Sequence, residues 1–236
     1  MKKYLISYGD SNYAIQKEFL RETATASSFF DEIIIFNPED IDHSFEEHIH
    51  DITLHGRGGG YWTWKPYFVK RILDQLDEND ILTYCDAGSM INGIAKTRFE
   101  EYMGLLQSSL TGTLDFELPF KEFQYTKQEV FNYFNTPTSV VNSNQLMATV
   151  LILKKCAHTD MIVGHWYNTV LENLFLFTDE KNGTQHLNFI DHRHDQSIFS
   201  VIRKTYGANI IPDETYFLDF LREGRGFPFW ATRLKR

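Results

Sequence analysis

Asp86 is the residue whose position most favours chemistry. It follows Ile81–Cys85, an apolar run typical of a buried strand, and precedes Ala87 and Gly88, whose small size lets a backbone and a ligand approach closely. In open α/β sheets ligands bind beyond the carboxyl ends of the strands, where this carboxylate would lie. An ionised Asp there can hold a ribose hydroxyl or a divalent cation bound to a diphosphate. The alternative is an ordinary Asp in a turn after a strand.

A second candidate site is the segment Arg57–Pro66, with the sequence RGGGYWTWKP. Its glycines permit unusual backbone angles, and its aromatic rings offer flat faces to a base or a sugar. Its two cations could neutralise phosphate oxygens near a helix N-terminus, although the P-loop spacing is absent. The alternative is a turn whose rings anchor a helix to the sheet. The candidate ligand-binding residues here are Arg57, Gly60, Tyr61, Trp62, Trp64 and Lys65.

A third cluster, Asp191–Ser197, crowds five ionisable groups at the expected start of a helix. An imidazole can ligate a cation, and a carboxylate can take a proton from a hydroxyl. His192 and His194 are therefore candidate metal ligands with Asp86, and Asp195 is a candidate base. The alternative is a capped, solvated helix start. The other histidines between residues 43 and 55 match no structural zinc spacing and are read as polar loop.

Alternating apolar runs and helical patterns must position these residues, and they predict an α/β fold. Residues 39–60 are expected to form a long loop with one short helix, a length that is usually functional. The sequence shows no internal repeat and no obvious linker. Strands are expected at 4–8, 31–37, 81–85 and 146–153, and helices at about 12–24, 66–76, 97–106, 126–134, 157–174 and 195–206.

The bulk composition limits the classes of partner. The 236 residues carry a net charge of −9, which gives no general attraction to nucleic acid or to an anionic membrane. Two cysteines, Cys85 and Cys156, make no disulfide framework and favour a reducing compartment. The apolar stretch at the N-terminus is too short for a signal peptide, and no run is long enough for a transmembrane segment. We therefore expect a cytoplasmic protein.

Four separated motifs together resemble a GT-A-type, glycosyltransferase-like family of bacteria and large viruses, tied to surface polysaccharide or glycan synthesis. They are GYWTWKP (60–66), DILTYCDAG (80–88), HRHDQSIFS (192–200) and ATR (231–233). The resemblance implies a GT-A-like, nucleotide-sugar-binding α/β/α sandwich with a mostly parallel central sheet. Residues 1–236 would form one domain, with a nucleotide-binding half at about 1–95. An acceptor half with a C-terminal lid would cover about 96–236.

The resemblance also implies the reaction, the transfer of a sugar from a nucleoside-diphosphate sugar to a hydroxyl of a glycan or a lipid-linked sugar. Asp86 would hold the ribose or a metal-bound diphosphate, and Lys65 would offset the charge of the leaving group. Trp62 and Trp64 would shape the base or sugar pocket. Asp195 would be the acceptor base, in which case transfer inverts the anomeric centre, or would orient hydroxyls. The remaining donor-binding residues would be Arg57, Gly60, Tyr61, Ala87, Gly88, Gln145 and Gln196.

This sequence departs from the GT-A pattern in its metal-binding motif, and its C-terminus is a further candidate for the site. GT-A enzymes usually carry Asp-x-Asp, and Gly88 stands in place of the second acid, which puts a Mn or Mg ion in question. His192, His194 or Asp195 would have to replace the missing ligand, or cationic residues would stand in for the metal. The basic, aromatic end of the chain could close over a diphosphate through Arg233 or Lys235, or could be a solubilising tail.

Other functions remain open on the same residues. A nucleotidyltransferase or a sugar-nucleotide hydrolase would normally need more clustered carboxylates for two metals. A non-catalytic carbohydrate-binding domain would use exposed Trp residues without a nucleotide. If the acceptor is carried by a membrane, the protein would associate peripherally with that membrane.

Overall fold

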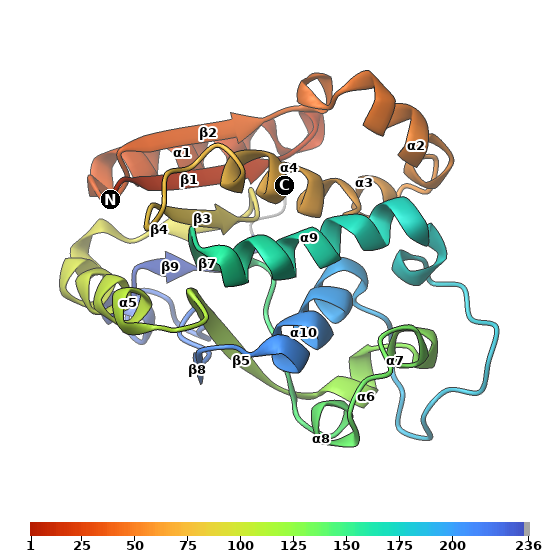
Figure 1. Ribbon diagram of the computed structural model, residues 1–236. Coiled ribbons are helices and arrows are strands. Elements are labelled where there is room, and N and C mark those ends of the chain that lie inside the picture. The colour runs from red at the N-terminus through yellow and green to blue at the C-terminus, as the bar shows by residue number, and fades with distance from the viewer. Residues whose placement is uncertain (234–236) are drawn as a thin grey trace.

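Short apolar runs form one central mixed sheet in the computed structural model, which describes residues 1–233 (Figure 1). Within those residues the sheet has seven strands, and all five residues of its third strand in the sequence are buried. In spatial order they are β2 (Glu32–Phe36), β1 (Lys3–Tyr8), β3 (Ile81–Cys85), β7 (Val150–Lys154), β5 (Thr113–Lys121) and β6 (Asn144–Leu146), with β8 (Ile210–Pro212) also paired to β5.

Most of the strands run in one direction. The pairs β1–β2, β1–β3 and β5–β8 are parallel, whereas β7 is antiparallel to both of its neighbours and β6 is antiparallel to β5. β1, β2, β3, β5 and β8 therefore point the same way. The predicted mostly parallel sheet is confirmed.

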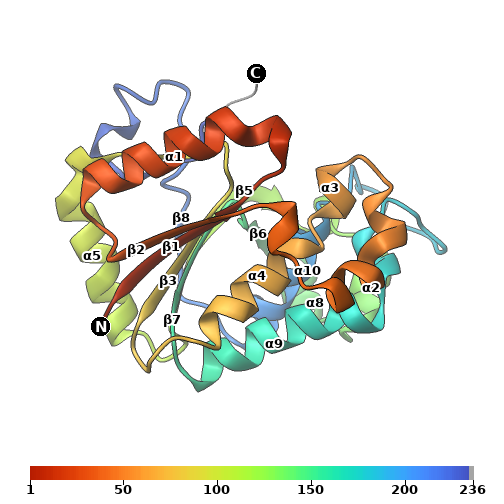
Figure 2. The same cartoon turned by 90° about the horizontal axis from the view of Figure 1, so that it is seen from above.

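Helices cover both faces of the sheet, so the molecule has three layers (Figure 2). Two separate apolar clusters fill the spaces between the layers. The helices over one face are α1 (Ala14–Ser27) and α5 (Lys96–Ser108). Those over the other face are α4 (Trp64–Leu73), α9 (Ala157–Glu172) and α10 (His194–Tyr206), with α2 (His43–Thr53) beside them. The expected α/β/α sandwich is confirmed.

The sequence-based expectations about elements were only partly right. The stretch 39–60 contains the one helix expected there, but this helix, α2, has eleven residues, because Phe45, Ile49 and Ile52 recur at helical spacing and pack into the core. The apolar run 146–153 is two strands, β6 and β7, separated by residues 147–149. The sequence reading also missed β5, which pairs with three other strands.

Short elements make the remaining connections. The short helical turns are η1 (Ser11–Tyr13), η2 (Pro38–Asp40), α3 (Gly58–Tyr61), η3 (Gly93–Ala95), α6 (Glu122–Tyr125), α7 (Gln128–Tyr133), α8 (Thr138–Val141), η4 (Leu174–Phe177) and η5 (Gly224–Gly226). A separate two-stranded ribbon pairs β4 (Met90–Ile91) with β9 (Phe229–Trp230). Among the helices of residues 1–233, none has the length and apolar character needed to cross a bilayer.

Candidate active site

The side-chain amine of Lys65 lies at the centre of the candidate site. Lys65 is in the first turn of α4, and its Nζ lies 2.7 Å from Asp195 Oδ2 and 3.1 Å from Asp86 Oδ1. The amine also donates to the main-chain oxygen of Ala148, at 3.2 Å. The start of α4, the end of β3 and the start of α10 therefore meet on one cation. We call Lys65, Asp86 and Asp195 the Lys65 cluster.

The Lys65 cluster joins one cation to two carboxylates and is exposed at one of them. Lys65 and Asp195 are 2% and 4% exposed, whereas the Asp86 side chain is 33% exposed. Burial raises the pKa of Asp195 to about 6, although Lys65 opposes the shift. Burial disfavours the charge on Lys65, but Asp195 and Asp86 outweigh it and raise the lysine pKa. The ammonium therefore stays charged, and Asp195 titrates close to the pH at which a general base works well.

Tyr84 supports Asp86 from within the sheet, and the sequence reading did not identify it. Its hydroxyl donates to Asp86 Oδ1 at 2.8 Å, and its ring lies under Lys65 Nζ, 5.0 Å from the ring centroid. Tyr84 is 1% exposed, and burial raises its pKa well above the usual value. The phenol therefore keeps its proton and serves as a donor. Its sequence signals were its place in the apolar run, two residues before Asp86, and its inclusion in the motif DILTYCDAG (80–88).

The chain between β6 and β7 forms one wall of the cluster. Thr149 accepts a hydrogen bond from the amide of Asp86 at 2.9 Å, which places this crossing beside the end of β3. The amide of Ala148 donates to Gln196 Oε1 at 3.2 Å, and the carbonyl of the same residue accepts from Lys65. Since a continuous strand could not turn these groups toward α10, the break between β6 and β7 is what positions them.

Gln145 and Gln196 act together, one behind the other. Gln196 is half-buried, and its Nε2 donates to Gln145 Oε1 at 2.8 Å. Gln145 is fully buried and donates to Glu122 Oε1 at 2.9 Å. Gln145 therefore orients Gln196 from inside the protein, and of the two only Gln196 has exposed surface for a ligand.

The glycine-rich segment forms a single left-handed turn. All residues of Gly58–Trp62 have positive φ, from 55° at Tyr61 to 93° at Gly60. The left-handed conformation costs an L-residue about 1–2 kcal/mol, and glycine avoids that cost. A Cβ added to Gly58 would also lie 2.5 Å from the Trp62 ring. The glycines are thus needed for the turn, which also holds two aromatic residues in a strained backbone.

The aromatic side chains of this turn divide between the core and the site. Trp64 is 6% exposed; its ring packs on Tyr8 with centroids 4.0 Å apart, and its Nε1 donates to the carbonyl of Gly58. Trp62 is half-buried and stacks on His194, with ring centroids 5.4 Å apart. Tyr61 is buried and packs on the same imidazole. Trp64 therefore anchors the turn to the sheet, and Trp62 is the tryptophan of this turn with surface left for a ligand.

Arg57 connects the left-handed turn to the long loop that precedes α10. Its guanidinium donates to Asp179 at 2.9 and 3.0 Å and to Asp191 at 2.9 Å. The Arg57 side chain is 44% exposed, and it lies outside the Lys65 cluster contacts. Its charge is thus already balanced by two carboxylates, and its visible role is to hold the turn against the loop.

The two histidines are held by backbone groups. His192 Nδ1 accepts from the amide of Lys127 at 3.3 Å, so its Nε2 carries the proton that reaches Leu176 O at 2.8 Å. His194 Nδ1 lies 2.7 Å from the carbonyl of Phe177, and it is the ring proton that makes this bond. Burial lowers the pKa of His192 well below its usual range and that of His194 to about 4. Both imidazoles are therefore neutral and anchor the loop after α9.

The predicted metal ligands do not converge on a common point suited to a divalent ion. Asp86 Oδ1 is occupied by Lys65 and Tyr84, and both ring nitrogens of His192 are engaged by backbone groups. Across residues 1–233 no group of three or more His, Cys, Asp or Glu side chains is placed to hold a metal ion. The Lys65 ammonium contacts both Asp86 and Asp195, the position in which a bound metal ion would be expected.

The C-terminal segment lies against the Asp86-Ala-Gly turn. Strand β9 pairs with β4, and Thr232 Oγ1 donates to the carbonyl of Gly88 at 2.7 Å. Ala87 is 5% exposed and Gly88 is half-buried. Arg233 is exposed and lies over the ring of Tyr216. The other predicted closing residue, Lys235, is outside the described residues.

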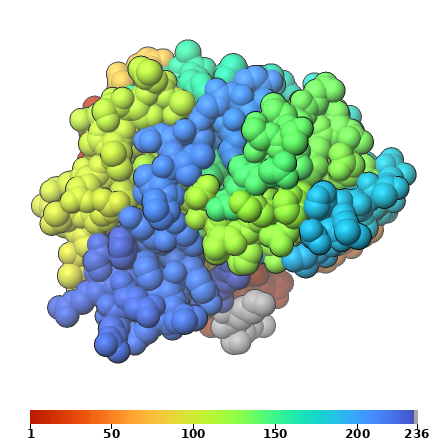
Figure 3. All heavy atoms as spheres, turned by 90° about the horizontal axis from the view of Figure 1, so that it is seen from below, coloured from red at the N-terminus to blue at the C-terminus, as the bar shows by residue number. Residues whose placement is uncertain are grey.

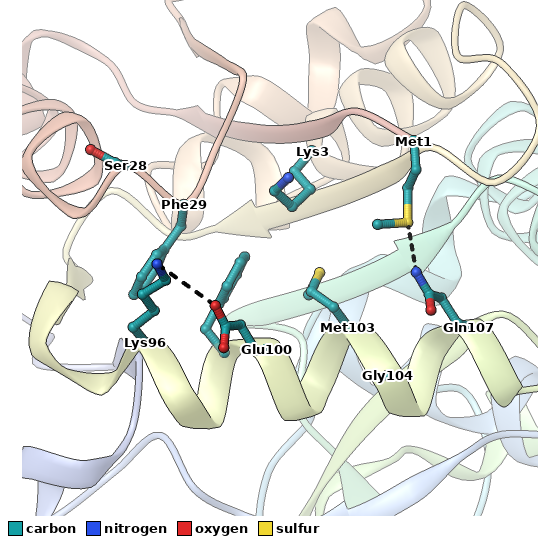
Figure 4. Close-up of a pocket in the computed structure, with 10 residues that line it drawn as sticks. Met1, Lys3, Ser28, Phe29, Lys96, Glu100, Met103, Gly104 and Gln107 are labelled. Carbon is teal, nitrogen blue, oxygen red and sulfur yellow. Dashed lines mark hydrogen bonds and ion pairs between the residues drawn. The ribbon is translucent and has the colours of Figure 1, made fainter.

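A cavity of about 400 Å³ lies at the opposite end of the sheet (Figure 4). It is bounded by α5 and by the start of β1, with Met1 and Lys3 on one side and Phe29 near Lys96 on the other. Among residues 1–233, no predicted site residue lines it. The candidate chemistry is therefore confined to the carboxyl edge of β3.

Comparisons with known proteins support the fold. No family model matches the chain, and a search of curated proteins gives no match. A solved glycosyltransferase involved in the glycosylation of the major capsid of PBCV-1 aligns with a TM-score of 0.55 and 10% identity, over 98% of this chain and 93% of that one. Weaker likenesses include the glycosyltransferase GlyE of Streptococcus pneumoniae TIGR4, with a TM-score of 0.49, 18% identity, and coverage of 92% of this chain and 46% of that one. The galactosyltransferase LgtC aligns with a TM-score of 0.47 and 12% identity, over 91% of this chain and 75% of that one. At these identities the likeness is one of fold: the chain has the GT-A-like α/β/α architecture that its motifs predicted.

Proposed function

We propose that this chain is a glycosyltransferase that moves a sugar from a nucleoside-diphosphate sugar to a hydroxyl acceptor. The observation that carries the proposal is the Lys65 cluster, a buried cation with two carboxylates at the carboxyl edge of a GT-A-like sheet. In such sheets this edge is where nucleotides bind. The half of the chain up to about residue 95 would bind the nucleotide, and the rest would bind the acceptor.

Asp86 is the proposed donor-binding carboxylate, because it is the exposed member of the cluster. Its free surface would accept hydroxyl hydrogen bonds from the ribose or from the transferred sugar. Trp62 would stack on the base or the sugar, and Gln196 would bind a sugar hydroxyl. Gly88 and Ala87 would let the ligand approach the main chain closely.

Asp195 is the proposed acceptor base, and Lys65 is a positioning residue. A carboxylate with a pKa of about 6 is ionised at neutral pH and still basic enough to accept a proton as the acceptor oxygen attacks. Lys65 would hold Asp86 and Asp195 close together, since its Nζ contacts both carboxylates. It would also supply positive charge near the leaving diphosphate. Direct proton removal by Asp195 gives inversion at the anomeric carbon, which the product's anomeric configuration reports.

We further propose that transfer does not require a divalent cation. Asp86 Oδ1, one of the oxygens that would coordinate a metal, instead forms an ion pair with Lys65 and accepts a hydrogen bond from Tyr84. The Lys65 ammonium would provide the fixed positive charge that a metal supplies in Asp-x-Asp enzymes. Arg233, on the segment beside Gly88, would add mobile charge from the C-terminal side.

The acceptor is proposed to be a glycan or a lipid-linked sugar. Exposed Leu218 and Leu221, at 90% and 79%, follow Tyr216 on the loop near the C-terminal segment. Apolar side chains presented this way support peripheral contact with a membrane that carries a lipid-linked acceptor.

A thermal-shift screen tests the donor assignment. UDP-, GDP-, CMP- and dTDP-sugars are each added with manganese and, separately, with EDTA. At least one should raise the melting temperature, since a ligand at 100 times its Kd stabilises by about 2.7 kcal/mol. The shift should be equal in manganese and EDTA. If no donor stabilises the protein, the proposed function is contradicted. If a shift appears only with manganese, the proposal that transfer needs no divalent cation is contradicted. With a UDP-, GDP- or dTDP-sugar, release of nucleoside diphosphate, not monophosphate, separates transfer from the rival phosphate chemistries.

A further inference from the structure

A cavity of about 710 Å³ opens beside the Lys65 cluster, on the face formed by β5 and the segment after β8. Figure 3 shows this side of the molecule, where the green and blue parts of the chain lie against each other. The volume is within the range of small-molecule sites. Its walls combine aromatic or apolar surfaces, Phe120, Leu118 and Tyr216 among them, with charged groups at Arg193, Arg233, Glu117 and Asp213.

The cavity is connected to the Lys65 cluster through hydrogen bonds. Met147 lines it, and the next residue, Ala148, accepts from Lys65. Arg193 also lines it and donates to Gln145 Oε1 at 3.4 Å, the oxygen that accepts from Gln196. A ligand in this cavity would therefore contact Arg193, which shares its hydrogen-bond acceptor, Gln145 Oε1, with Gln196. This link is the reason to connect the cavity with the acceptor side of the proposed reaction.

Arg193 brings an unbalanced charge to this cavity. Its guanidinium packs against two rings that contact each other, 3.8 Å from the centroid of Tyr125 and 4.7 Å from that of Phe120. Among residues 1–233, no Asp or Glu lies within ion-pair distance of it. Burial lowers the pKa of Arg193, in line with a charge that lacks water and a counter-ion. A half-buried cation of this kind gains strongly from an anionic ligand.

The rest of the wall selects among anions. A planar guanidinium binds a carboxylate through two parallel hydrogen bonds, and the rings nearby suit the apolar face of a pyranose. Glu117 and Asp213 also line the cavity and offset the charges of Arg193 and Arg233, so the wall has no net positive charge that would favour a doubly charged phosphate over a singly charged carboxylate.

We propose that this cavity is an acceptor subsite in which Arg193 binds the carboxylate of a uronic-acid-type sugar. Its role as acceptor subsite rests on the proposed function; binding of the acidic sugar does not. Tyr125 and Phe120 hold the guanidinium in place, and Gln145 fixes its orientation toward the cavity. The sugar hydroxyl nearest Gln196 is then the one that receives the transferred residue.

Calorimetric titration of the whole chain tests this with three methyl glucosides that differ only at carbon 6. They are methyl β-D-glucuronide, methyl β-D-glucoside and methyl β-D-glucoside 6-phosphate. The glucuronide should bind at least tenfold more tightly than the glucoside, the usual gain from hydrogen bonds to a charged group. It should also bind more tightly than the phosphate. A glucuronide no tighter than the glucoside, or weaker than the phosphate, would overturn the proposal.

Variants locate the binding. Arg193→Met keeps an unbranched chain against the two rings and should abolish the preference for the glucuronide, whereas Arg193→Lys should keep part of it. Arg222→Met, at an exposed arginine that does not line the cavity, should change nothing. A preference that survives in Arg193→Met would overturn the assignment to Arg193.

Titration with the stabilising nucleotide sugar separates the two proposals. Arg193→Met should bind that donor as the natural chain does, and weakened donor binding with intact glucuronide binding would overturn the acceptor assignment. If the protein binds the glucuronide but no nucleotide sugar, the proposed function is contradicted and the carboxylate-binding site is supported. If it binds a nucleotide sugar but does not prefer the glucuronide, only the proposal about Arg193 is contradicted.

Discussion

Among the buried ion clusters within residues 1–233, the Arg203–Asp115 pair and the Lys65 cluster balance their charges differently. Arg203 and Asp115 form a one-to-one pair at 2.5 Å, and both side chains are 1% exposed. The remaining polar atoms are satisfied nearby: Asp115 Oδ2 accepts from Thr113, and Arg203 donates to the carbonyl of Met147. This pair is closed and neutral, as a buried ion pair must be if it serves the fold alone.

The Lys65 cluster differs in both respects. It sets one cation against two carboxylates, and Asp86 reaches the surface. Burial leaves Asp195 with a pKa of about 6. Two carboxylates that share one cation at the end of a strand cost stability. Such unbalanced, partly exposed charges are typical of functional sites. The contrast between the two clusters fits the proposal that one pair of charges serves the fold and the Lys65 cluster serves the reaction.

The largest expected effect is that of Asp195→Asn on catalysis. Loss of the proposed base should lower kcat by about 10²–10⁴, the range for general base catalysis. Because the change removes a buried carboxylate with a raised pKa, the melting temperature at pH 7.5 should not fall. Asp115→Asn is the matched control from the closed pair, and its activity per folded molecule should stay within about twofold of the natural chain. An Asp195→Asn enzyme with nearly full turnover would contradict the assignment.

The next effect is on stability, and it concerns the two cations. Lys65→Met and Arg203→Met each leave buried carboxylate without a counter-charge, which costs about 3–5 kcal/mol. Adding Asp195→Asn to Lys65→Met should restore more than half of the loss, because a single, partly exposed carboxylate remains. Urea unfolding of the single and double variants measures this coupling. Additive losses would mean that Lys65 and Asp195 do not interact as described.

Buried neutral histidine gives a pH dependence of stability. The pKa of His194 falls from about 6.5 when unfolded to about 4 when folded, so its contribution is complete above pH 6.5 and is lost as pH falls toward 4. About 2 kcal/mol should be lost between pH 7.5 and pH 5. Asp195 has the opposite sign, since its raised pKa adds stability as the pH falls through 6. The difference in unfolding free energy between the natural chain and His194→Asn isolates the histidine, and a difference independent of pH would contradict a neutral His194.

The left-handed turn should show a smaller effect. Gly58→Ala introduces a Cβ at a φ of 61° and against the Trp62 ring, and should cost about 1–2 kcal/mol. Gly56→Ala is the matched control, because a Cβ there meets no atom within 4 Å. Equal melting temperatures for the two variants would show that the turn does not have this backbone.

The sequence predicted the parts of the site that depend on local pattern. An apolar run followed by Asp-Ala-Gly placed Asp86 at a strand end, and Lys65 followed from a helix start after glycines and rings. Both predictions concern one segment each, where spacing alone decides the outcome. The α/β class followed for the same reason, from strands and helices that alternate along the chain.

What the sequence could not supply was the set of contacts between distant segments. The meeting of Lys65 with Asp195 depends on the crossing of α4 and α10, and Trp64 became a core residue because Tyr8 lies beneath it. Gln145 looked like a ligand-binding residue until its burial against Glu122 was visible. Arg193 carried no signal beyond its place in a charged cluster.

The affinity of the stabilising nucleotide sugar for Asp86→Asn and for Asp115→Asn is the most direct test of the central claim. Calorimetric titration is done at a temperature where both variants are folded. If the open Lys65 cluster binds the donor and the closed pair does not, Asp86→Asn should raise the Kd at least tenfold, as expected for loss of a charged hydrogen-bond acceptor. Asp115→Asn should keep the Kd of the natural chain. Equal donor affinity in Asp86→Asn and the natural chain would contradict the account.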